Sequence, residues 1–159
     1  MINGLYLINM KFKSLTNNEW IDDTISYIKN YCQQNKDVKV YLGCDSQSRY
    51  EFTSYVITVV LHKGNFGCHV LYNKSKVPVI KSVYQKLWQE VEMVTAVGVW
   101  LNENDITVHH IDLDFNGQKD TISNKLIKSA AGYIEAHGLT CTYKPDILAA
   151  VKAADLLLR

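Results

Sequence analysis

Hydrophobic and polar residues alternate along the chain in a pattern that predicts the order helix, three strands, helix, strand, helix, strand, helix. Residues 38–42, 55–62 and 68–73 are rich in β-branched and aromatic side chains, as strands are. Gly64 and Gly67 lie in the second connection, where a tight hairpin needs a positive φ. Because the loops between these three strands are short, we expect an antiparallel meander.

Four segments have a helical spacing of apolar residues. The first helix is expected to begin at a capping box formed by Thr16–Glu19 and to contain Trp20. Pro78 stands where the second helix should start, because proline suits the first helical turn. Residues 121–137 predict the third helix, and Pro145 should open the last one.

Two strands are expected between these helices. Residues 106–115 follow the second helix, and a strand that follows a crossover helix usually runs parallel to an earlier strand. Residues 139–143 read as a short final strand. The sequence therefore predicts one mixed sheet with three antiparallel strands and a parallel fourth.

The stretch 38–47, VKVYLGCDSQ, joins a buried strand to a glycine and a carboxylate. Alternation places Tyr41, Gly43 and Asp45 on one face of the strand. Gly43 would let another backbone or a ligand approach closely. A carboxylate at the end of a core strand is costly unless it is solvated, paired or bound to metal. Asp45 is therefore either the cap of a turn or part of a site.

Further carboxylates are candidates for the same site. Helical phase places Glu90 roughly 60° from the centre of its apolar stripe, Asp114 lies at the end of strand 106–115, and Asp155 shares an inward face with Val151. Gathered carboxylates raise each other's pKa unless a cation neutralises them. Oxygen ligands suit Mg²⁺ or Mn²⁺, and two such ions can activate water for phosphodiester cleavage.

Each candidate also has a simpler interpretation. Glu90 could be a solvated residue on a helix flank, Asp114 could form an Asx turn, and Asp155 could pair with Lys144 or Lys152. Asp112 faces the same way as Asp114 and would replace it if the register shifted. Asp146 could replace Asp155, although a place in the first helical turn explains its charge as well.

Polar residues beside the acids are weaker candidates for substrate contacts. Ser46 and Gln47 could touch a substrate phosphate or orient Asp45, and Lys144 could meet a backbone phosphate. His110 could carry a proton near the site, although a strand histidine is more often packed and hydrogen-bonded. The full set of these weaker candidates is Ser46, Gln47, His110, Asn116 and Lys144.

Four motifs together resemble the bacterial YkuK-like, ribonuclease H-like family. They are Gly43-Cys44-Asp45-Ser46-Gln47, the helical Leu87-Trp88-Gln89-Glu90-Val91, Asp114-Phe115-Asn116, and Lys144-Pro145 through Ala153-Ala154-Asp155. No single motif is specific, but their order and spacing cover residues 10–158 or so. The resemblance implies a five-stranded mixed sheet of order 3-2-1-4-5 with helices on both faces.

The resemblance also implies where the acidic residues would act. In that fold the active-site acids lie on the first strand, the helix after the third strand, the fourth strand and the last helix. They correspond here to Asp45, Glu90, Asp114 and Asp155. The expected activity is metal-dependent hydrolysis of a nucleic acid, inherited from the fold, and a fold alone does not fix a function.

Composition changes this picture little. A length of 159 residues suits one domain over 10–159, with 1–9 as a loose extension before a second possible start at Met10. A net charge of +1 does not indicate nucleic-acid binding, but a local basic patch would not show in the net charge of the whole chain. No run reaches transmembrane length, and no C-x-x-C pair predicts a zinc site among the four cysteines.

We therefore expect a cytoplasmic enzyme with buried free thiols, Mg²⁺ or Mn²⁺ as cofactor and nucleic acid as partner. Two rivals remain on sequence grounds. One is a module of the same fold that binds nucleic acid without cutting it. The other is a protein-interaction domain that uses its tyrosines and an exposed strand edge.

Overall fold

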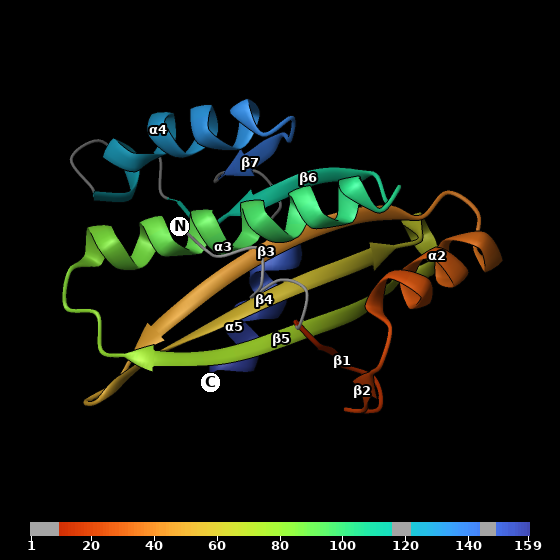
Figure 1. Cartoon of the computed structure of the whole chain (residues 1–159), viewed down its shortest axis with the longest axis horizontal. Helices are drawn as coiled ribbons and strands as arrows, with labels where there is room; N and C mark the ends of the chain where they lie inside the picture. The colour runs from red at the N-terminus through yellow and green to blue at the C-terminus, as the bar shows by residue number, and fades with distance from the viewer. Residues whose placement is uncertain (1–9, 116–121, 144–148) are drawn as a thin grey trace.

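One mixed sheet forms the centre of the molecule (Figure 1). The computed structural model describes residues 10–115, 122–143 and 149–159, so the expected extension over 1–9 lies outside it. Within these residues seven strands lie in the order β2-β1-β5-β4-β3-β6-β7. The predicted α/β class with a mixed sheet is confirmed, and the sheet has two strands more than the five expected.

The elements alternate along the chain much as the hydrophobic pattern predicts. In order they are β1 (Phe12–Ser14), β2 (Trp20–Ile21), α2 (Thr24–Gln34), β3 (Lys39–Ser48), β4 (Phe52–His62), the short 3-10 helix η1 (Gly64–Phe66), β5 (Cys68–Pro78), α3 (Val83–Glu103), β6 (Val108–Leu113), α4 (Ile122–Ala136), β7 (Cys141–Tyr143) and α5 (Ala149–Leu158).

The expected strand pairings are present. β3 and β4 are antiparallel, as are β4 and β5, so the predicted meander is confirmed. β3 and β6 run parallel, with Gly43 beside Asp112, and β6 and β7 are also parallel. In the turn after β4, Gly64 and Gly67 adopt φ values of 57° and 90°, as the hairpin prediction required.

The N-terminal helix begins later than the sequence predicted, and the capping box at Thr16–Glu19 is wrong. These residues connect β1 to β2, and Asn18 has a φ of 59°, a left-handed conformation that interrupts a helix. The true N-cap is Asp23, whose side chain accepts a 3.0 Å hydrogen bond from Ser26 N. The first helix therefore contains neither Trp20 nor the residues before it.

Pro78 ends a strand instead of starting a helix, so that expectation is also wrong. β5 continues to Pro78, which lies opposite Phe52, beyond the part of β5 that pairs with β1. A proline at the end of a strand leaves few ladder hydrogen bonds unmade. α3 begins at Val83, and the Ser82 side chain caps it by accepting from Gln85 N.

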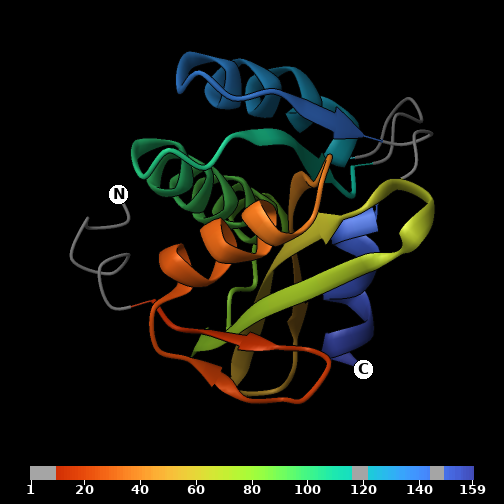
Figure 2. The ribbon, with the colours of Figure 1, turned by 90° about the vertical axis from the view of Figure 1, so that its right-hand side faces the viewer.

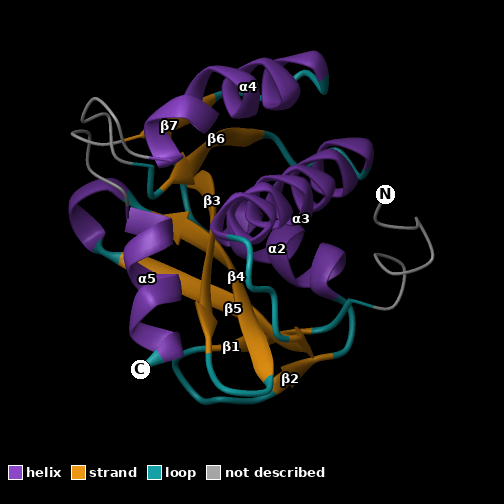
Figure 3. Ribbon diagram, turned by 90° about the vertical axis from the view of Figure 1, so that its left-hand side faces the viewer, coloured by secondary structure: helices purple, strands orange, loops and turns teal. Residues whose placement is uncertain are grey.

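Helices cover both faces of the sheet, as expected. α2 and α3 lie against one face, and α5 is the one described helix that lies against the other (Figures 2 and 3). The larger hydrophobic core fills the space under α2, α3 and α4. A smaller one, formed by Val56, Ala154 and Leu158, lies under α5. Polar contacts at the start of α5, described below, add to this apolar contact.

The expectation of buried free thiols is met only in part. All four cysteines are free thiols, but Cys68 is exposed and only Cys44 is fully buried. Within the described part of the chain, no helix combines the length and the apolar character needed to cross a bilayer.

Candidate active site

The neighbouring strands β3 and β6 bring two predicted acids to the same end of the sheet. Asp45 was expected at the end of its strand, but β3 continues past it to Ser48, whereas Asp114 directly follows the end of β6. Both strands point towards the left of Figure 1. Gly43 lies beside Asp112 in the parallel register, and Asp45 and Asp114 each follow that pair by two residues. Because side chains alternate along a strand, Asp45 and Asp114 share the face that α5 covers. The Asp114 carboxylate accordingly raises the pKa of Asp45.

Asp45 lies among both acidic and basic groups. Its pKa is raised, chiefly because burial disfavours the charged carboxylate. The N–H of Ser46 donates a 2.8 Å hydrogen bond to Asp45 Oδ1 and lowers the pKa, whereas Asp114 and Asp155 raise it and Lys86 lowers it. Asp45 is therefore within electrostatic reach of two of the three other predicted acids, and it influences the third, as described next.

Glu90 is buried, with 4% of its surface exposed, on the second turn of α3. Burial is the main reason why its pKa rises to about 8. The Ser46 hydroxyl donates a hydrogen bond to Glu90 Oε1 and opposes this rise, while Asp45 and Asp114 add to it and Lys86 opposes it. Glu90 is thus more deeply buried than a helix-flank position predicts.

Ser46 connects the two faces of β3 at this edge. Its backbone N–H binds Asp45, while its hydroxyl points to the opposite face and binds Glu90. The sequence suggested that Ser46 orients Asp45 or contacts a phosphate. The geometry supports orientation of both carboxylates, and a phosphate contact stays a prediction. Gln47, also a weak candidate, is exposed and accepts a 3.4 Å hydrogen bond from Arg49.

Asp155 is less enclosed than its helical phase predicted. α5 buries Ala150, Val151, Ala154 and Leu158, while the Asp155 side chain is 46% exposed at the margin of that face. It forms an ion pair at 2.8 Å with Arg159, not with Lys152. Asp155 nevertheless raises the pKa of Asp45, so it belongs to the same edge of the molecule.

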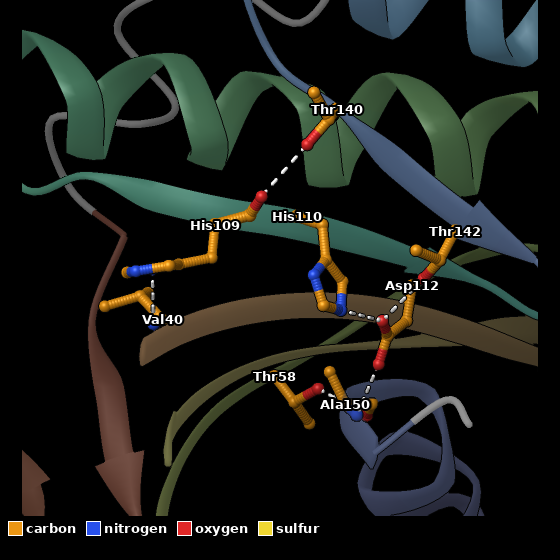
Figure 4. Close-up of polar contacts among 8 residues, drawn as sticks. All are labelled: Val40, Thr58, His109, His110, Asp112, Thr140, Thr142 and Ala150. Carbon is orange, nitrogen blue, oxygen red and sulfur yellow. Dashed lines mark hydrogen bonds and ion pairs between the residues drawn. The ribbon is translucent and has the colours of Figure 1, made fainter. Parts of the chain in front are cut away.

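Asp112 is a structural residue in this geometry (Figure 4). Only 1% of it is exposed, and its oxygens accept hydrogen bonds from Thr142 Oγ1 at 3.1 Å and Ala150 N at 2.8 Å. His110 Nε2 lies 3.0 Å from Asp112 Oδ1, and the His110 ring stacks on Tyr41 at 4.2 Å. Asp112 ties β6 to β7 and α5, and His110 has the packed, hydrogen-bonded environment of the simpler interpretation.

The start of α5 is fixed to the sheet by close backbone contacts. Thr58 Oγ1 donates a 2.7 Å hydrogen bond to Ala150 O, and Asp112 accepts from Ala150 N (Figure 4). A Cβ on Gly43 would lie 2.6 Å from Ala150 C and from Val151 N. The expected close approach at Gly43 is therefore confirmed, and the approaching backbone is that of the helix that carries Asp155.

The acids offer only oxygen donors, which suit a hard divalent cation. Across residues 10–115, 122–143 and 149–159, however, no three His, Cys, Asp or Glu side chains lie close enough together to hold an ion as they stand. Asn116, Lys144 and Asp146 lie outside the described residues.

Sequence reasoning missed one charged residue of the site, Lys86. It influences the pKa of both Asp45 and Glu90. Lys86 precedes Glu90 by four residues on α3, a spacing that places both side chains on one helix face and could have identified it. Tyr55 supports this turn, because its buried hydroxyl donates a 3.3 Å hydrogen bond to Lys86 O.

The buried Glu90 carboxyl predicts a pH-dependent stability of the metal-free protein. Its folded pKa of about 8 lies above the ordinary value of 4.5, so between these values the folded chain holds a proton that the unfolded chain has lost. The free energy of unfolding should therefore fall as pH rises through this window, by up to ~1.4 kcal/mol per pH unit from this group. Urea unfolding in EDTA across this pH range measures the slope.

Glu90→Gln should remove that contribution, so the difference in stability between wild type and variant should change with pH. Glu103→Gln is the matched control, because Glu103 is exposed at the far end of the same helix. An equal pH slope for wild type and Glu90→Gln would contradict the assigned burial of Glu90.

Comparison with known proteins identifies the class to which this fold and this set of acids belong. A model of the family described as Ribonuclease H-like matches residues 23–158. The chain therefore belongs to the ribonuclease H-like family, in its YkuK-like branch, as its motifs indicated. Searches of curated proteins and of solved structures gave no significant match.

Proposed function

We propose that this protein is a divalent-metal-dependent nuclease that hydrolyses phosphodiester bonds of a nucleic acid. Membership of the ribonuclease H-like family, which includes nucleases, supports this function. The observation that carries it is geometric. Asp45 on β3 and Asp114 just after β6 lie on neighbouring parallel strands, and Ser46 binds both Asp45 and Glu90 of α3. The neighbouring carboxylates accordingly raise the pKa of Asp45 and of Glu90. Such a gathering of carboxylates is costly without a cation.

The residues present fit Mg²⁺ or Mn²⁺ by their chemistry. Asp45, Glu90 and Asp114 would hold the ion with carboxylate oxygens, and Asp155 would complete the set by exchanging its partner Arg159 for it. A bound ion lowers the pKa of a coordinated water and stabilises the leaving oxygen. Side-chain movements are needed first, because the described acids are not arranged to coordinate one ion.

The other residues at this edge prepare the acids. Ser46 orients Asp45 and Glu90 through its two hydrogen bonds. Lys86 supplies a positive charge that favours the ionised form of both carboxylates. Neither residue needs to contact the scissile bond to influence how readily the acids bind a cation.

A cleavage panel tests the proposed activity. Wild-type protein is incubated with Mn²⁺ or Mg²⁺ and, separately, an RNA–DNA hybrid, single-stranded RNA, single-stranded DNA and branched DNA. At least one substrate should be cut with metal and none in excess EDTA. Absence of cutting on every substrate, with either metal, would contradict the nuclease proposal.

The second candidate is a module that binds nucleic acid without cutting it. The Asp155–Arg159 ion pair favours it, because an acid occupied by its own neighbour is not free for a cation. Such a module would bind nucleic acid equally well with and without divalent metal, and its affinity would fall steeply with salt. Gel shifts in EDTA and in Mg²⁺ separate the two functions.

A further inference from the structure

A segment rich in lysine crosses the edge of the sheet beside the acids. Residues 74–86, KSKVPVIKSVYQK, contain four lysines and no carboxylate, although the whole chain has a net charge of only +1. Lys74, Lys76 and Lys81 are exposed. The fourth, Lys86, is half-buried and reaches Asp45 and Glu90 electrostatically. The positive charge is therefore concentrated in this segment, and the segment ends at Lys86, beside the candidate active site.

Hydrogen bonds fix this segment to the turn between β3 and β4 and to the start of β4. Val79 N donates to Glu51 O at 3.2 Å, and Ile80 N donates to Thr53 Oγ1 at 2.9 Å. The turn itself, residues 49–52, is closed by a hydrogen bond from Arg49 N to Phe52 O at 2.8 Å. The lysines therefore belong to one continuous surface with the turn, and that surface is held in place.

The turn adds another cation and a free aromatic ring to this surface. Arg49 is exposed, and Tyr50 has a relative exposure of 102%, so its ring packs on nothing in the described structure. Lys76 Nζ lies 4.4 Å from the ring centre of Phe52, the next aromatic residue. Glu51 is the one carboxylate in this turn. Binding of a single strand requires cations that contact its phosphates and an aromatic ring on which a base can stack. This surface offers both.

We propose that Lys74, Lys76, Lys81, Lys86, Arg49 and Tyr50, here named the cationic strip, bind the backbone and one base of single-stranded nucleic acid. The strip offsets the repulsion between phosphates and the nearby acids. A single strand fits better than a duplex, because only an unpaired base can stack on the Tyr50 ring. The inference deepens the proposed nuclease, since the strip would deliver this strand to Asp45.

Binding without metal tests the strip apart from the chemistry. The probe is a fluorescein-labelled oligothymidylate of about 15 nucleotides, and anisotropy is measured with full-length protein in EDTA over a range of salt. Lys76→Gln/Lys81→Gln should lower the slope of log K against log salt by about 1.4, because each phosphate contact contributes about 0.7. Tyr50→Ala should weaken binding about tenfold, the loss of one stacked base.

Matched control variants lie at the opposite end of the sheet. Lys36→Gln/Lys39→Gln removes the same charge before and at the start of β3, and Phe66→Ala removes an 87% exposed ring in the turn before β5. Both control proteins should bind the probe as wild type does. If the strip variants and the control variants lose the same affinity for the probe, or if neither loses any, the proposal that the cationic strip binds nucleic acid is overturned.

A duplex of the same length decides the class of nucleic acid. Weaker binding of the duplex, unaffected by Tyr50→Ala, supports the single-strand assignment, and duplex binding as tight as that of the oligothymidylate overturns it. The cleavage panel is independent of these measurements. If binding depends on the cationic strip but no substrate is cleaved, the nuclease proposal is contradicted and the strip proposal is supported. If a substrate is cleaved but binding does not depend on the strip, the strip proposal is contradicted and the nuclease proposal is supported.

Discussion

Asp45→Asn is expected to lower metal-dependent cleavage about a thousandfold, a loss of ~4 kcal/mol in transition-state stabilisation. Asp45 is the acid whose pKa responds to both Asp114 and Asp155 and which itself acts on Glu90. It is therefore the common member of the set, and an amide cannot supply its negative charge to a cation. The rate is measured at saturating Mn²⁺ on the best substrate of the panel.

The same variant should fold at least as stably as the wild type without metal. Burial and two neighbouring carboxylates disfavour the charged form of Asp45, and an asparagine Oδ1 can still accept the hydrogen bond from Ser46 N. Thermal unfolding in EDTA therefore separates lost chemistry from lost structure. Asp105→Asn is the control, since Asp105 is 94% exposed and pairs with Lys29 at the other end of the molecule. Cleavage by Asp45→Asn at the wild-type rate would contradict the assignment.

Gly43→Ala should destabilise the protein by about 3 kcal/mol, at the upper end of what overpacking costs. The added Cβ would meet Ala150 C and Val151 N at 2.6 Å, and backbone atoms cannot rotate away as a side chain can. Helix α5 would have to move, which strains the bonds that Thr58 and Asp112 make to Ala150. Because α5 carries Asp155, cleavage should fall as well.

Urea unfolding followed by circular dichroism measures this effect, and Gly132→Ala is the matched control. Gly132 lies in α4 with no atom within 4 Å of an added Cβ, so alanine should stabilise the helix there by about 0.5–1 kcal/mol. If Gly43→Ala is as stable as the wild type, the close packing of α5 on β3 is wrong.

Hydrophobic periodicity was sufficient to predict the inner strands and the long helices. Val40 and Leu42 face the larger core, and the stripe through Val91, Val94 and Leu101 is buried as helical spacing requires. These elements are long, so the pattern repeats often enough to be read. Their order along the chain then fixed the meander and the parallel strand.

Short elements could not be predicted in the same way. β1 and β2 have three and two residues, too few for any period, and their pairing with each other and with β5 depends on contacts far along the chain. At Thr16–Glu19 a local capping pattern was outweighed by the turn at Asn18. The prediction of a helix start at Pro78 was wrong because proline suits the end of a strand as well as the start of a helix.

The sequence predicted where some of the candidate acids lie in the fold, but not their environment. Sequence placed Asp45 and Asp114 at strand ends, and the structure brings both to one edge. The sequence suggested that Ser46 orients Asp45, but it gave no sign that Ser46 also binds Glu90, because that contact spans 44 residues. Helical spacing could have suggested the ion pair between Asp155 and Arg159, which are four residues apart, but not that Asp155 is 46% exposed at the margin of α5.

Calorimetric titration with Mn²⁺ tests most directly whether these acids form one cation site. Wild-type protein and Asp105→Asn should bind the ion with the same affinity, whereas Asp45→Asn and Glu90→Gln should each lose most of the binding heat. If wild type takes up no Mn²⁺, or if Asp45→Asn takes it up as wild type does, the carboxylates at this edge do not act together.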